Sequence, residues 1–274
     1  MKAIYFFFAG TLLFVFQGCN NFKSTHPQAE LAAEAGATGM TDKSILIFTT
    51  AIDRQLSNFK KEYSLIYLSG DLSLYAERYS QYNDGILYRA FSSRGNLTHL
   101  IKSYYFKNDS LVLVRERTET TNQEGAPVLK DTRTYLRNNV AFRMETRTAA
   151  SAEAIRKLPY SAVQLPGSKY PDENYKEDII VLNDALAGKD KFEMVFQNIM
   201  TYPEARYIVL KSKKQPDYTA TVRVNESDNF IDSLLTMPAI FKEKHLNFRW
   251  RIADKEAVYV PVADTVTSAS GLNR

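Results

Sequence analysis

The stretch SYYFKNDSLVLVRER, residues 103–117, decides the fold of this chain. Residues 103–106 are mainly aromatic and residues 110–114 mainly aliphatic, and both kinds of side chain favour the pleated surface of a strand. Between them lies Lys107-Asn108-Asp109, and asparagine and aspartate readily adopt the positive φ angles that a tight hairpin turn needs. The stretch therefore predicts an antiparallel hairpin.

The same pattern continues on both sides of this hairpin. Strand-like segments separated by short turns rich in Asn, Asp and Gly cover residues 72–82, 86–92, 97–106, 110–121, 128–136 and 140–147. Consecutive strands joined by such turns predict an antiparallel β-meander. In the last segment Val140, Phe142 and Met144 alternate with Arg143 and Glu145, so we expect the first set on a buried face and the second on a wet or ligand-facing one.

A helical pattern precedes the strands. Apolar residues at spacings of three and four form one stripe: Ile45, Phe48, Ile52, Leu56 and Phe59. Thr41 or Asp42 can cap the start of this helix. A helix with a single apolar stripe packs on a flat partner, so we predict an N-terminal helix packed on the antiparallel β-meander, as one domain over residues 44–164.

The second half of the chain also mixes helices and strands. Pro166, Gly167 and Pro171 mark a boundary. Beyond it the periodicity predicts helices over residues 175–186 and 228–235 and strands over 205–211, 218–224, 246–252 and 258–262. The predicted fold class is therefore α+β, in which the helix and meander are followed by a smaller α+β unit of hairpins and helices at 165–264 and a flexible tail at 265–274.

The pattern of the first residues of the chain predicts an export signal. Lys2 precedes an apolar run over residues 3–16, which as a helix spans only about 21 Å, well short of the roughly 30 Å hydrocarbon core of a membrane. A short basic start and an apolar core of this length are typical of a secretory signal peptide. Gly18 and Cys19 follow the run, and Cys19 is the only cysteine in the chain.

These residues resemble the signal of bacterial lipoproteins, in which the cysteine becomes the first mature residue and carries acyl chains. The resemblance implies a signal peptide at 1–18, cleavage between Gly18 and Cys19, lipidation of Cys19, and a tether at 19–43. The alternative is that Cys19 is an incidental thiol after an ordinary signal or an uncleaved anchor. Asn20-Asn21-Phe22-Lys23 lacks the acidic residues that mark surface export in some bacteria, which favours a periplasm-facing protein on the outer membrane. The 103–112 hairpin is similar to those of β-rich envelope lipoproteins.

Composition and motifs exclude several function classes. The chain has 35 Lys and Arg against 31 Asp and Glu, an imbalance too small to predict a nucleic-acid partner. It contains no Gly-x-Ser-x-Gly elbow, no His-Glu-x-x-His, no phosphate-binding loop and no calcium loop. We therefore predict no cofactor, no metal site and no catalytic residue of a recognisable class.

Carboxylate pairs leave one enzymatic hypothesis open. Glu116 with Glu119, or Asp131 with Glu145, could act as acid and base if the fold brought them together. A solvated, charge-paired strand face explains the same residues more simply. The alternative function is therefore an envelope hydrolase that uses carboxylates from separate strands.

Two sets of side chains are candidates for facing a ligand. Tyr79, Tyr88 and Tyr104 belong to a group of tyrosines that could stack on sugar rings or bind a peptide edge, although cross-strand packing is the simpler interpretation. Arg115 and Arg143 lie in the basic region 89–147, which could face anionic lipid headgroups or an acidic glycan, or could be a solvated sheet face. We predict a lipid-anchored cell-envelope protein of binding or scaffolding type. Its partners are the membrane through the anchor and a glycan, a lipid or an envelope protein.

Overall fold

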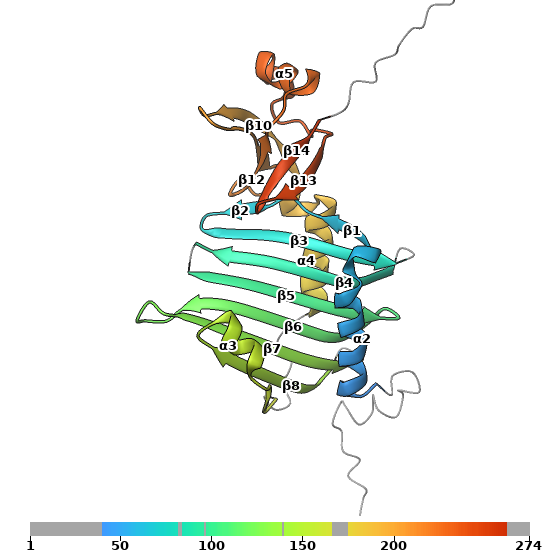
Figure 1. Ribbon diagram of the computed structural model, residues 1–274. Helices are drawn as coiled ribbons and strands as arrows, with labels where there is room; N and C mark the ends of the chain where they lie inside the picture. Colours follow the sequence, from blue (N-terminus) through green and yellow to red (C-terminus); the bar gives the residue numbers. More distant parts are fainter. Residues whose placement is uncertain (1–39, 82–83, 96, 139, 166–174, 262–274) are drawn as a thin grey trace, which may run out of the picture. The chain divides into compact units, whose positions relative to one another are not determined.

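The structure is a computed structural model that describes residues 40–81, 84–95, 97–138, 140–165 and 175–261 (Figure 1). The predicted signal peptide, Gly18, Cys19, all but the last residues of the tether, the boundary at 166–171 and the tail lie outside these residues.

The predicted meander is present. Six consecutive strands pair antiparallel: β3 (Leu72–Gln81), β4 (Asp84–Arg94), β5 (Thr98–Lys107), β6 (Ser110–Thr121), β7 (Pro127–Arg137) and β8 (Val140–Ala149). In the β5–β6 turn Asn108 has a φ of 48° and Asp109 a φ of 60°, the left-handed conformation for which these residue types were expected. Local turn chemistry thus fixes the order of the strands.

The sheet continues beyond the meander. Its other strands are β1 (Lys60–Tyr63), β2 (Tyr67–Ser69), β9 (Ser161–Val163), β10 (Met194–Thr201), β11 (Arg206–Ser212), β12 (Tyr218–Val224), β13 (Arg249–Ala253) and β14 (Glu256–Val260). β2 pairs with β3 on one side and with β12 on the other, which joins the C-terminal strands to the meander. β12 and β14 run parallel, so the sheet is mixed. A mostly antiparallel sheet occurs together with helices, and the predicted α+β class is confirmed in this broad sense.

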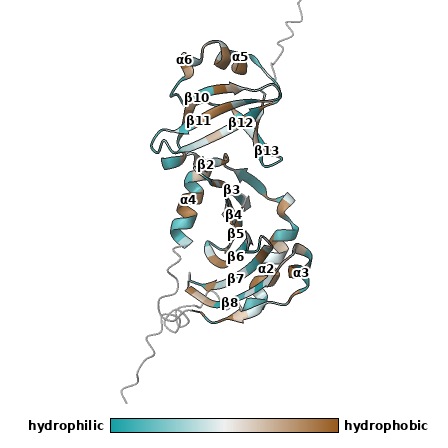
Figure 2. Ribbon diagram, turned by 90° about the vertical axis from the view of Figure 1, so that its left-hand side faces the viewer, coloured by the Kyte–Doolittle hydropathy of each residue, from teal (hydrophilic) through white to brown (hydrophobic). Residues whose placement is uncertain are grey.

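The described α-helices are α2 (Asp42–Arg54), α3 (Ala152–Lys157), α4 (Tyr175–Ala187), α5 (Asn229–Thr236) and α6 (Pro238–Phe241). α5 and α6 lie against β10. In Figures 1 and 2, α2 lies on one face of the sheet and α4 on the other. Among the described residues, no helix is long and apolar enough to cross a membrane.

Two apolar clusters fill the two faces because side chains alternate along each strand. Tyr105 packs with Ile45 and Ile52 of α2, whereas its neighbour Tyr104 belongs to the cluster that contains Leu182 and Ala185 of α4. The side-chain oxygen of Thr41 accepts a hydrogen bond from the Ser44 N–H at 3.2 Å and caps the start of α2. Each face of the meander is therefore partly buried against a helix.

One expectation about β8 was wrong. Glu145, predicted on the wet face, is 6% exposed. Phe142 does not share a face with Met144, because the β7–β8 register shifts between Tyr135 and Leu136 and brings Phe142 against the Tyr135 ring, with ring centroids 6.2 Å apart. A β-bulge, which the alternation of residue types did not reveal, moves this side chain.

Replacing Ile45 with alanine is expected to lower the free energy of unfolding by about 2 to 4 kcal/mol, because its side chain is fully buried and its loss leaves a cavity. Ile47→Ala is the matched control, since Ile47 lies on the same helix and is 64% exposed. Urea unfolding followed by circular dichroism measures both. Equal losses in the two variants would show that α2 does not pack on the sheet through Ile45.

Candidate functional site

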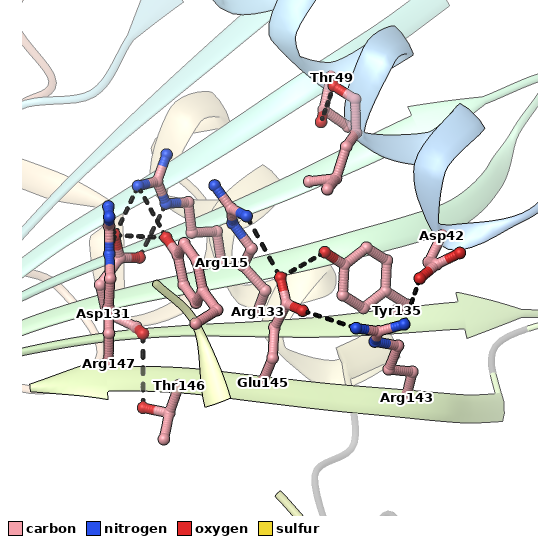
Figure 3. Close-up of polar contacts among 12 residues, drawn as sticks. Asp42, Thr49, Arg115, Asp131, Arg133, Tyr135, Arg143, Glu145, Thr146 and Arg147 are labelled. Atoms are coloured by element: carbon pink, nitrogen blue, oxygen red, sulfur yellow. Dashed lines mark hydrogen bonds and ion pairs between the residues drawn. The ribbon is translucent and has the colours of Figure 1, made fainter. Parts of the chain in front are cut away.

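Charged residues gather on the α2-side face of β6, β7 and β8 (Figure 3). The strand register places Arg115 opposite Arg133, Arg133 opposite Glu145, and Asp131 between Arg117 and Arg147. The "arginine face" denotes this set: Arg115, Arg117, Arg133, Arg143 and Arg147 with the carboxylates Asp131 and Glu145.

Asp131 is the centre of the arginine face and is 3% exposed. Its carboxylate accepts hydrogen bonds from Arg115 Nε at 2.9 Å and Nη2 at 2.6 Å, from Arg147 Nη2 at 2.9 Å, and from the Tyr160 hydroxyl at 2.7 Å. Burial alone would raise the pKa of Asp131, but the hydrogen bonds from Arg115, Tyr160 and Arg147 hold it well below its usual value. The carboxylate therefore stays ionised.

Glu145 is held in the same manner. It accepts hydrogen bonds from the Tyr135 hydroxyl at 2.6 Å, from Arg133 Nη1 at 3.2 Å and from Arg143 Nη2 at 3.2 Å. Arg143 also pairs with Asp42, the first residue of α2. These contacts fasten the start of the helix to the end of the sheet.

The Tyr160 ring covers part of the arginine face. It lies between α3 and β9, with the guanidinium carbons of Arg133 and Arg147 3.7 Å and 4.3 Å from its ring centroid. These are cation–π contacts, in addition to the hydrogen bond to Asp131. Only Arg117 is loosely held, with a 52% exposed side chain whose Nε lies 4.0 Å from Asp131.

The carboxylates of the arginine face are poorly suited to acid–base chemistry. Asp131 and Glu145 share a face, as the hydrolase hypothesis requires, but each is bound by its own arginines. A general acid or base needs a pKa near the working pH, and that of Asp131 is shifted away from it. Glu116 and Glu119 are three residues apart on β6, so their side chains point to opposite faces.

The five predicted ligand-facing residues divide between the two faces. Arg115 and Arg143 belong to the arginine face and are ion-paired there. Tyr79 is 6% exposed on the α2 side, where its hydroxyl donates to Glu77 at 2.8 Å. Tyr104 is 1% exposed on the α4 side and donates to Asp178 of α4 at 2.5 Å, and Tyr88 is 9% exposed in the same cluster. The structure thus brings the two arginines together and places the three tyrosine rings in the interior.

A groove of about 600 Å³ opens on the α4 side. The "α4 groove" is lined by side chains from β1, β3, α4 with the residues that follow it, and the start of β13 with the residue before it: Lys61, Glu62, Tyr63, Arg78, Asn183, Asp184, Leu186, Ala187, Lys189, Phe248, Arg249 and Trp250. An adjoining apolar hollow of about 190 Å³ shares Leu186, Ala187, Phe248 and Trp250 with it. The volume of this groove lies in the range of small-molecule sites, and its lining combines three aromatic side chains with charged and amide groups.

Internal hydrogen bonds fix the aromatic wall of the α4 groove. The Tyr63 hydroxyl donates to the Trp250 carbonyl at 2.9 Å, and the Trp250 indole N–H donates to the Ser64 carbonyl at 3.4 Å. The Phe248 ring lies 5.7 Å from that of Trp250, measured between centroids. Both polar aromatic groups are therefore used within the protein, and the side chains present carbon surface to the groove.

The polar side chains of the groove fall into two sets. Lys61 pairs with Glu77 at 2.6 Å, and Arg78 Nε donates to Glu62 at 2.6 Å. Within the part of the chain that the structure describes, the other four polar side chains have no hydrogen bond or ion pair: Asn183, Asp184, Lys189 and Arg249. These four groups are available to a ligand.

Sequence reasoning missed this groove because its walls come from four separate segments of the chain. The one local signal was Trp250, the only tryptophan of the chain. The described residues contain no group of three or more His, Cys, Asp or Glu side chains that could hold a metal ion. Comparisons of the chain with protein-family models, curated proteins and solved structures found no match.

Proposed function

We propose that this chain is a lipid-anchored binding protein of the cell envelope and that its ligand occupies the α4 groove. The observation that carries the proposal is the pairing of a fixed aromatic wall with four polar side chains that have no partner among the described residues. Polar groups in that state are free to exchange water for a ligand, whereas Asp131 and Glu145 are already satisfied.

Binding is favoured over the alternative, an envelope hydrolase. Of the two groove carboxylates, Glu62 is paired: burial acts to raise its pKa, but hydrogen bonds from Lys60 and Arg78 lower it below the usual value. A glycoside hydrolase of the common kind needs one carboxylic acid with a raised pKa to protonate the leaving group. Glu62 is shifted in the opposite direction.

The location of the protein is proposed from its sequence. A lipid on Cys19 would hold the chain at the outer membrane, facing the periplasm, and residues 19–43 would act as its tether. The finer division into a helix-and-meander part at 44–164 and a smaller α+β part at 165–264 belongs to the same proposal. The groove would lie where the two parts meet, since its lining comes from both.

Trp250 makes the proposal testable, because the intrinsic fluorescence of this protein has a single tryptophan source. We expect at least one class among oligosaccharides, lysophospholipids and short peptides to change the Trp250 emission saturably. Asp184→Ala should weaken that binding about 10-fold or more, because a charged hydrogen-bond partner is lost. Fluorescence titration measures both effects.

The matched control is Asp217→Ala, which removes an exposed carboxylate outside the groove and should leave the affinity unchanged. Thermal melts verify that both variants fold. If no class alters the emission, or if Asp184→Ala and Asp217→Ala bind equally well, the groove is not the binding site.

A further inference from the structure

We infer that the ligand of the α4 groove is an acidic saccharide: Lys189 and Arg249 bind its carboxylate, and Asn183 and Asp184 bind its hydroxyls. This inference rests on the proposed function and goes further by naming the class of ligand. Three properties of the groove support it, namely its charge, its aromatic wall and its hydrogen-bonding groups.

The charge of the groove selects an anion. Its lining contains four cationic side chains and two carboxylates. Lys61 and Arg78 are already paired, with Glu77 and Glu62 respectively. The remaining charged side chains of the groove are the cations Lys189 and Arg249 and the carboxylate Asp184, which leaves one excess positive charge. Neither cation has an ion pair among the described residues. A ligand with one net negative charge would balance this excess, and Arg249 can bind a carboxylate through two parallel hydrogen bonds.

The aromatic wall selects a ligand with flat carbon surface. Because the Tyr63 hydroxyl and the Trp250 indole N–H are both bonded within the protein, these side chains offer ring carbon and no further donor. Amphipathic rings of this kind bury apolar surface while their polar tips stay satisfied. The C–H face of a pyranose ring meets that requirement, and so does an acyl chain.

Asn183 and Asp184 separate these two possibilities. An acyl chain over them would remove water from an amide and a carboxylate without replacing its hydrogen bonds, which is unfavourable. Asp184 also repels a second negative charge on the same ring, which favours a ligand with one carboxylate per sugar unit. Neighbouring sugar hydroxyls, by contrast, donate to Asp184 and both donate to and accept from Asn183. A hydroxyl-rich ring with one carboxylate per unit satisfies all these groups.

The test uses the full-length protein in detergent and compares trigalacturonate with its methyl ester. The two probes share rings and hydroxyls and differ in charge. We expect trigalacturonate to change the Trp250 emission saturably. Its methyl ester should bind at least about 10-fold more weakly, or not at all. Arg249→Gln and Lys189→Gln should weaken binding of the acid and leave binding of the ester unchanged. Trimannuronate is included as a second acidic sugar.

Each outcome has a defined meaning. Equal affinity for acid and ester, or the same effect of Arg249→Gln on both, would overturn the role of the carboxylate. Binding of a lysophospholipid or a peptide, with neither acidic sugar bound, would overturn the saccharide inference and leave the proposed binding function standing. If no probe of any class binds, both fail. Lys255→Gln, in the β13–β14 turn outside the groove, is the matched charge control.

Discussion

Replacing Asp131 with asparagine is expected to lower the free energy of unfolding by about 3 to 5 kcal/mol, the cost of removing one partner from a buried ion pair. Arg115 and Arg147, with side chains 14% and 13% exposed, would keep their charges without a counter-ion. The Tyr160 hydroxyl would lose its charged acceptor, which is one of the contacts that hold the α3–β9 segment on the sheet. Urea unfolding at pH 7 measures the loss.

Asp71→Asn is the matched control, since Asp71 is 65% exposed and pairs with Arg94 only at 3.8 Å. We expect Asp71→Asn to cost less than about 1 kcal/mol, as the loss of most surface pairs does.

The pH dependence of the stability gives a second check. Because the folded-state pKa of Asp131 lies below its ordinary value of 3.8, its stabilisation is complete above that value and is lost as the pH falls below it. The difference between wild type and Asp131→Asn should therefore shrink in acid, and a constant difference would contradict the assigned ion pairs.

Cys19→Ser is expected to abolish fatty-acid labelling of the protein and to leave its signal peptide uncleaved. In the lipoprotein class that residues 1–19 resemble, the cysteine carries three acyl chains. Each buried methylene contributes about 0.8 kcal/mol, so several chains make attachment effectively permanent. Without the thiol no acyl chain can attach, and the signal is not cleaved by that route. Fractionation and labelling with a fatty-acid probe measure the change.

Ser24→Ala, in the same predicted tether, is the control and should stay in the membrane fraction with full labelling. The lipoprotein proposal would be wrong if Cys19→Ser remained membrane-bound with unchanged labelling. Retention of both proteins in the membrane fraction, without any labelling of the wild type, would point instead to an uncleaved apolar anchor.

Much of the meander could be predicted from the sequence because turn and strand signals there are local. The predicted strand at 110–121 coincides with β6, and the boundaries of the other five differ from prediction by at most two residues at either end. β1, β2, β9 and β10 were missed. Residues 60–63 lack alternation, residues 67–69 and 161–163 are too few to show it, and a register shift between Phe196 and Asn198 interrupts β10. Such strands form only because a neighbour pairs with them.

The candidate site was less predictable for the same physical reason. Arg115 and Arg143 were identified by charge, but sequence could not show that Asp131 and Glu145 neutralise them in the interior. The α4 groove joins residues near 62, 184 and 249, and no periodicity relates positions so far apart. A pattern confined to one strand or helix reveals what that element buries, whereas a groove is a property of the packing between elements.

The three-residue strand β2 has a consequence for how the molecule comes apart. Within the described sheet, β2 is the only strand that pairs with both the meander and β12. If β2 unfolded, the edges of two strands would be exposed at once. Exposed edges are prone to pair with other chains. We therefore expect the described residues to unfold in one cooperative transition when heated or pulled. We also expect proteolytic cleavage between β1 and β3 to produce fragments that aggregate.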